Sequence, residues 1–191
     1  MLMIFVYNCI WLRFILKSFL HVTMALPYFE LSEKYRPEKV ETLLVGEGPP
    51  PSGDKYFYLP AKMNPKRDIR NYRSLPATIF YHYFRSIPSS IEEYESLLFR
   101  LKERNIFLID ILDRPLKIRD SSFPKGVDVE NYKILLSSIP KLKEKIRERG
   151  IAISEDRIIF LLARTSYINE LKQEFPNAQY FRWIDFRMES E

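Results

Sequence analysis

The stretch Thr42-Leu43-Leu44-Val45-Gly46-Glu47-Gly48-Pro49-Pro50 decides how this chain is expected to fold. Its first four residues form a short apolar run that ends at a glycine, a pattern typical of a buried strand. Gly46 and Gly48 let the backbone approach other groups closely, and the prolines that follow stiffen the loop that carries Glu47. We therefore predict a strand over 42–45 and a rigid turn that fixes one carboxylate in place.

Three more apolar runs of strand length follow along the chain, at 106–112, 157–163 and 179–184. Amphipathic patterns with helical spacing lie between them. Because strands that alternate with helices are typical of βαβ units, the sequence predicts a three-layer α/β/α fold with a central, mostly parallel four-stranded sheet. The expected helical stretches are 79–84, a stretch from the capping-box sequence at 90–93 to 101, 129–138, 140–149 and 166–175.

Two interpretations stay open for the helical pattern around Pro140. Residues 129–138 and 140–149 form two helices, or they form one helix that the proline breaks. Gly150 is the expected stop signal at the end of this region, since glycine commonly follows the last turn of a helix.

The composition predicts one globular domain over residues 24–191. The chain has 191 residues, of which 46% are hydrophobic and 15% aromatic, enough for an ordinary core. Its single cysteine, Cys9, cannot form an internal disulfide, and no cluster of cysteines and histidines is present to hold zinc or an iron-sulfur cluster. We therefore expect a cytoplasmic monomer that needs no metal.

The first 23 residues are apolar but carry Arg13 and Lys17 in the middle, which is costly for a membrane-spanning helix. The charges follow the apolar run instead of preceding it, which argues against a secretory signal. An amphipathic helix at a membrane surface is one interpretation. The preferred one is an extension upstream of a natural start at Met24, so no stable membrane span is expected.

Candidate functional residues lie where the predicted strands end, because ligands of parallel α/β sheets bind outside the carboxyl ends of the strands. This rule selects the loop 46–58, Asp110 and Asp113, the segment 164–166, and Asp185. The first loop also contains three consecutive aromatic residues at 56–58. Such rings can stack on a planar ligand or can pack into the core.

The segment Leu43-Leu44-Val45-Gly46-Glu47-Gly48-Pro49 resembles the first motif of the uracil-DNA glycosylase superfamily, especially its Gly-Glu-Ala-Pro-Gly variants. The similarity extends to the aromatic segment 56–58 and to 107–110, which stands where the family has a strand that ends in a uracil-reading Asn. The resemblance covers most of 40–186 in architecture.

The resemblance implies that the protein acts on DNA without a cofactor and hydrolyses an N-glycosidic bond after a base is extruded into a pocket. Tyr56 or Phe57 would stack on the base, and Glu47 would orient or activate a water molecule. The pocket residues that it implies are Gly46, Gly48, Pro49, Tyr56, Phe57 and Asp110.

The chain departs from the family pattern at two places. The family commonly uses a His after its fourth strand, whereas the histidines of this chain are His21 and His82. Asp110 stands where an Asn is expected, and an ionised Asp can only accept hydrogen bonds. Asp110 is either a ligand-reading group or a structural carboxylate that caps a neighbouring helix. The chain is accordingly an active glycosylase or a noncatalytic nucleic-acid-binding module.

A basic segment follows the aromatic one, and the chain as a whole carries a net charge of +5. Its side chains could contact the phosphates of a nucleic acid with little sequence preference, or could form a solvated basic surface. The basic residues are Lys62, Lys66, Arg67, Arg70 and Arg73, beside the acidic Asp68.

Overall fold

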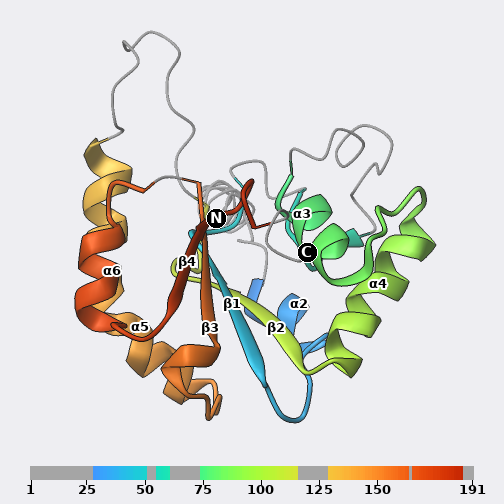
Figure 1. Ribbon diagram of the computed structural model, residues 1–191, viewed down its shortest axis with the longest axis horizontal. Coiled ribbons are helices and arrows are strands. Elements are labelled where there is room, and N and C mark those ends of the chain that lie inside the picture. Colours follow the sequence, from blue (N-terminus) through green and yellow to red (C-terminus); the bar gives the residue numbers. More distant parts are fainter. Residues whose placement is uncertain (1–27, 51–54, 61–73, 116–128, 164, 187–191) are drawn as a thin grey trace, which may run out of the picture.

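The computed structural model describes residues 28–50, 55–60, 74–115, 129–163 and 165–186 (Figure 1). The strands of these ranges are β1 (Thr42–Gly46), β2 (Ile106–Asp110), β3 (Ile158–Leu162) and β4 (Gln179–Arg182). The helices are α2 (Tyr28–Glu33), α3 (Leu75–Phe84), α4 (Ile91–Glu103), α5 (Val129–Glu148) and α6 (Ile168–Glu174), with a short 3-10 helix at Glu155–Arg157.

The sheet has the order β2-β1-β3-β4, and each neighbouring pair of strands is parallel. From β1 the chain moves to β2 at one edge of the sheet. From β2 it moves back past β1 to β3 and then to β4 at the other edge. Because crossovers between parallel strands are right-handed, this reversal puts the connecting helices on opposite faces. Figure 1 shows α3 and α4 on one side of the sheet and α5 and α6 on the other. The predicted three-layer α/β/α fold with a parallel four-stranded sheet is confirmed.

The apolar run of β2 is longer than the strand itself. Sequence predicts a strand to residue 112, whereas β2 ends at Asp110. The backbone N–H groups of Ile111 and Leu112 still donate to the carbonyl oxygens of Gly46 and Glu47, at 2.8 and 3.1 Å. The end of β2 is therefore tied to the turn that follows β1.

Helices α3 and α4 begin where polar residues cap their free N–H groups. The Ser74 hydroxyl accepts from the backbone N of Ala77, and the Ser90 hydroxyl accepts from the backbone N of Glu93. A side-chain oxygen at this position satisfies a donor that the helix cannot pair. The capping interaction predicted at Ser90 is confirmed, although the Glu93 carboxylate reaches back to Ser89 instead.

Helix α5 runs without interruption through Pro140, so both interpretations of this segment are wrong: it is neither two helices nor one helix that the proline breaks. It ends at Glu148, and Gly150, the second residue beyond it, has a φ of +65°. Gly150 N donates to the carbonyl of Arg147, and Ile151 N donates to that of Ile146. This pair of bonds is the Schellman arrangement, so the predicted stop at Gly150 is confirmed.

The outer edge of β2 is covered by a tyrosine hydroxyl. Tyr58 is buried, its hydroxyl accepts from Leu108 N at 2.8 Å, and it donates to Leu108 O at 3.0 Å. An unpaired strand edge inside a protein leaves polar groups without partners. Tyr58 supplies both partners for Leu108, and it thereby positions the segment 55–60 beside the sheet.

Within the described ranges, no helix combines the length and apolar character that crossing a membrane requires. The apolar segment 1–23 and the basic segment 62–73, on which the sequence makes predictions, both lie outside the residues that the structure describes.

Candidate functional site

A cavity of about 250 Å³ lies beside the carboxyl ends of β1 and β2. The loop after β1, the aromatic segment, the first turn of α3 and the end of β2 line it, mostly with apolar surface. The lining residues are Gly48, Pro49, Pro50, Lys55, Tyr56, Phe57, Ser74, Leu75, Pro76, Leu108 and Asp110. The structure thus brings five sequence-predicted site residues, Gly48, Pro49, Tyr56, Phe57 and Asp110, to one hollow.

Gly46 belongs to this site through its contact with Asp110. The two residues are register partners in the β1–β2 pair. A Cβ atom added to Gly46 would lie 2.5 Å from Oδ1 of Asp110. Glycine at this position therefore makes room for the carboxyl group, which reaches the cavity over the backbone of β1.

Burial raises the pKa of the Asp110 carboxyl from 3.8 to about 7. Lys145 and Arg149 lower this pKa by their positive charges, whereas Asp113 and Glu47 raise it. The loss of solvation is the largest effect, because it disfavours the charged form of an acid. Asp110 is therefore an acid that exchanges its proton near neutral pH.

Tyr56 and Phe57 are largely packed into the core, and each keeps about 5% of its surface exposed. The Tyr56 hydroxyl donates to the carbonyl of Tyr28, and burial raises its pKa well above the ordinary value. The ring of Phe57 lies 5.7 Å from that of Phe80 in α3. These two residues therefore both pack into the core and line the cavity, and their rings form part of a fixed cavity wall.

Glu47 points toward the neighbouring strand β3. Its Oε1 accepts a hydrogen bond from the backbone N of Ala163 at 2.7 Å and another from the hydroxyl of Tyr167. The carboxylate is half-buried and does not line the cavity. It lies between β1 and β3, where the strand order reverses and where ligands of such sheets commonly bind. Sequence reasoning found Glu47 but not its partner Tyr167, which follows β3 at the amino end of α6.

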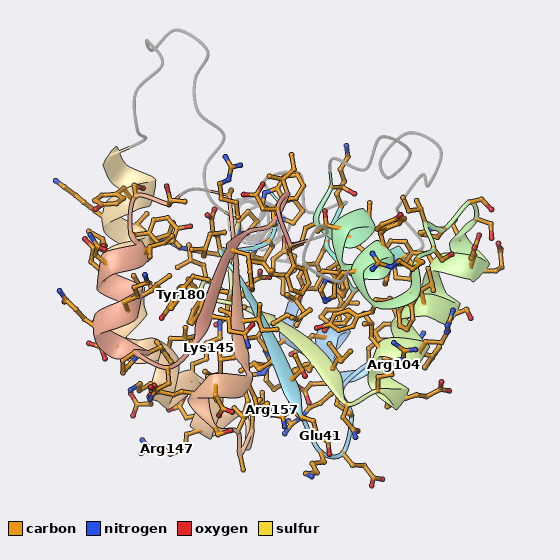
Figure 2. All side chains as sticks on the ribbon, viewed as in Figure 1. Glu41, Arg104, Lys145, Arg147, Arg157 and Tyr180 are labelled. Atoms are coloured by element: carbon orange, nitrogen blue, oxygen red, sulfur yellow. The ribbon has the colours of Figure 1, made fainter. Side chains whose placement is uncertain are left out.

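The other carboxylates selected by the strand-end rule are engaged in ion pairs. Asp113 accepts from Lys145 at 2.6 Å, and Asp185 accepts from Arg182 at 2.6 and 2.9 Å. Lys145 of α5 is labelled in Figure 2. Arg164 lies outside the described residues. So do the predicted phosphate-contacting residues Lys62, Lys66, Arg67, Arg70 and Arg73.

His82 packs against the C-terminal segment of the described chain. Its ring stacks on Phe186 with centroids 3.9 Å apart, and Nδ1 lies 2.8 Å from the Phe186 carbonyl oxygen. Since a carbonyl can only accept, Nδ1 carries the proton in this contact. His82 therefore joins α3 to the segment after β4.

Sequence reasoning missed the contribution of α3 to the site. Ser74, Leu75 and Pro76 lie in the first turn of this helix and line the cavity. The signal was present as a serine cap followed by a proline, which marks a helix start. That signal predicts the helix but not which loop its first turn faces.

Within the described part of the chain, no group of three or more His, Cys, Asp or Glu side chains is placed to hold a metal ion. Comparisons with protein-family models, curated proteins and solved structures found no match to this chain.

Proposed function

We propose that the cavity binds a single nucleobase presented by a nucleic acid strand, as the resemblance to uracil-DNA glycosylases implies. The observation that carries the proposal is the convergence of Gly48 and Pro49 from the loop after β1, two aromatic residues and Asp110 at one hollow. Its volume of about 250 Å³ falls just below the roughly 300–1,000 Å³ of pockets for drug-sized ligands. A ligand of the size of one base suits it.

The proposed reaction is hydrolysis of the N-glycosidic bond of a damaged or deaminated base in DNA. Such a base must leave the stack before a protein can reach it, and flat walls then hold it. Glu47 follows Gly46 in the chain, and two hydrogen bonds fix its carboxylate. In this proposal Glu47 orients the attacking water, and the basic residues between 62 and 73 contact phosphates.

A second candidate is a noncatalytic module that binds nucleic acid through the same cavity. The contacts of Glu47 favour it, because one carboxylate oxygen already accepts from both Ala163 and Tyr167. These bonds join the β1 loop to the start of α6, which is a structural role. In addition, no His follows β4, where the glycosylase family commonly has one.

Single-turnover base release by the full chain tests the proposal. The substrates are single- and double-stranded oligonucleotides that carry uracil, hypoxanthine or xanthine. The informative variant is Glu47→Gln, because its amide oxygen can still accept from Ala163 N and Tyr167. We expect the variant to lose at least about a hundredfold in rate, as is usual when a catalytic acid or base is removed.

Glu41→Gln is the matched control, because Glu41 is an exposed carboxylate paired with Lys39 at the opposite end of the sheet (Figure 2). It should release base at the wild-type rate. Base-dependent binding without release would establish the noncatalytic module. Binding that does not depend on the base would show that the cavity does not hold one.

A further inference from the structure

The carboxyl group of Asp110 is a polar group on an otherwise largely apolar cavity wall. Its neighbours on that wall include Leu108, Pro49 and Phe57. Gly46 leaves it the room to reach the cavity, because any larger residue at that position would meet its Oδ1. A group in this place meets whatever fills the cavity.

No hydrogen bond to the Asp110 carboxyl is formed by any group in the described ranges, although two cations lie near it. Lys145 Nζ donates to the backbone oxygens of Asp110 and Ile111 at 2.7 and 3.3 Å, and to the Asp113 carboxylate at 2.6 Å. The cation is therefore directed at the backbone and at a second carboxylate, and the Asp110 side chain keeps its hydrogen-bonding capacity for a ligand.

Arg149 is the second nearby cation, and its guanidinium is likewise engaged elsewhere. Its Nη2 donates to Ser32 Oγ at 2.6 Å and to the Glu33 carboxylate at 2.7 Å, both in α2. The ring of Phe107 packs against the same guanidinium at 5.2 Å. Arg149 thus acts on Asp110 through its charge alone.

Charges of both signs surround Asp110 and act on its pKa in opposite directions. Lys145 on α5 and Arg149 just after that helix lower its pKa, and Glu47 and Asp113 on the flanking loops raise it. The phenol of Tyr56 stays neutral because burial raises its pKa, and Lys55 also lines the cavity. Burial decides the result, and the pKa of Asp110 rises to about 7.

A bound base should raise the pKa of Asp110 further. Filling the cavity removes water from the carboxyl group, and loss of solvation favours the uncharged form of an acid. We propose that Asp110 recognises the edge of the ligand as a neutral carboxylic acid, which donates one hydrogen bond and accepts another. This inference rests on the proposed base-binding function. At a pH above the pKa of Asp110, binding of the base is accompanied by the uptake of one proton from solvent.

The neutral acid selects the class of base. A carboxylic acid has an O–H donor beside a carbonyl acceptor, so it matches an edge in which an acceptor neighbours an N–H donor. Uracil and hypoxanthine offer such an edge, with C=O next to N–H. The ionised form would accept twice and would match two neighbouring donors, as on guanine. The structure therefore assigns to Asp110 the choice of an uncharged base with a C=O and N–H edge.

The test measures the affinity of the full chain for oligonucleotides that carry one uracil or one abasic site at the same position. The ratio of the two affinities isolates the contribution of the base from that of the phosphates. We expect this ratio to be constant below about pH 6 and to fall by about tenfold for each pH unit above the pKa of Asp110. A guanine oligonucleotide serves as the two-donor probe over the same range.

Two variants make the result specific. Asp110→Asn offers a donor and an acceptor at every pH, so its uracil preference should not change with pH. Asp113→Asn removes an exposed carboxylate that raises the pKa of Asp110, so the fall should begin at lower pH. Circular dichroism establishes that both variants are folded.

The outcomes separate this inference from the proposed function. A uracil preference that is independent of pH in the wild type, or a guanine preference that is already present below about pH 6, would overturn the neutral-acid assignment and leave base binding intact. Equal affinity for uracil, guanine and abasic oligonucleotides at every pH would overturn base binding itself.

Discussion

At the scale of single residues, Gly46 sets the position of the Asp110 carboxyl. Its φ lies outside the left-handed region, so an alanine backbone fits there without strain. The obstacle is steric, because the new Cβ would lie 2.5 Å from Asp110 Oδ1. We expect Gly46→Ala to lower the free energy of unfolding by about 1–3 kcal/mol, as overpacking usually does. Urea unfolding followed by circular dichroism measures this change.

A double variant separates this clash from other effects of the substitution. In Gly46→Ala combined with Asp110→Ala the carboxyl is absent, so the two changes should be strongly non-additive. Gly48→Ala is the control, since its added Cβ would meet its nearest neighbours at 3.3 and 3.4 Å. If Gly46→Ala lowers the free energy of unfolding by the same amount in the wild type and in Asp110→Ala, as is expected for Gly48→Ala, the carboxyl does not lie where the structure places it.

The sequence predicts the site residues better than it predicts their partners. Gly46, Glu47 and Asp110 stand out because they lie at or near the ends of apolar runs, and that signal is local. The contact of Gly46 with Asp110 depends on the register of two strands 60 or more residues apart, and the bond from Tyr167 to Glu47 spans 120 positions. Nothing in a single sequence encodes these pairings through spacing.

At the scale of elements, Tyr58 closes the outer edge of β2. Its hydroxyl bonds both the N–H and the C=O of Leu108. In Tyr58→Phe these buried backbone groups lose a partner, which costs about 1–3 kcal/mol for an unsatisfied group. We expect the unfolding free energy to fall by this amount, and amide exchange at Leu108 to become faster than in the wild type. Hydrogen exchange followed by NMR measures the second effect.

Tyr83→Phe is the matched control for this prediction. Burial also raises the pKa of the Tyr83 hydroxyl, but no group in the described ranges hydrogen-bonds that hydroxyl. Its removal should change stability by less than about 0.5 kcal/mol. Equal losses in the two variants would mean that the hydroxyl of Tyr58 contributes nothing through Leu108.

Most elements from β1 onward follow closely from local patterns, with the exception of α5, whereas α2 is a helix that was not predicted from the sequence. The serine caps of α3 and α4 and the glycine after α5 are short-range signals, and each marks an observed boundary. Pro140 is also a local signal, but it does not end the helix. The apolar residues Leu135, Ile139, Leu142 and Ile146 on both sides of it are buried, so tertiary packing offsets the hydrogen bond that the proline lacks.

At the scale of the whole molecule, the strand order places the two predicted carboxylates in different surroundings. Asp110 at the end of β2 faces the cavity, whereas Glu47 after β1 bonds groups that follow β3. The sequence predicts that these loops meet at one edge of the sheet. It does not predict on which side of β1 each neighbour lies, because the order β2-β1-β3-β4 results from long-range contacts.

The raised pKa of Asp110 also makes the stability of the whole fold depend on pH. The unfolded carboxyl titrates near 3.8, and the folded one near 7. Between these values the folded state keeps a proton that the unfolded chain has lost, so stability falls as pH rises through this window. The opposite dependence comes from groups such as Glu93, whose pKa is lowered by hydrogen bonds from Ser89 and whose contribution is lost as pH falls.

Asp110→Asn isolates the first effect, since its amide is neutral at every pH. The unfolding free energy of the variant minus that of the wild type should be flat below about pH 4 and should rise by up to about 1.4 kcal/mol per pH unit from there to about pH 7. Above that pH the difference should be constant. Urea unfolding at closely spaced pH values measures it, and a difference that does not change over this window would show that the folded carboxyl is already ionised at low pH. Because the same proton is proposed to read the ligand, a bound uracil oligonucleotide should move the upper end of the window to higher pH.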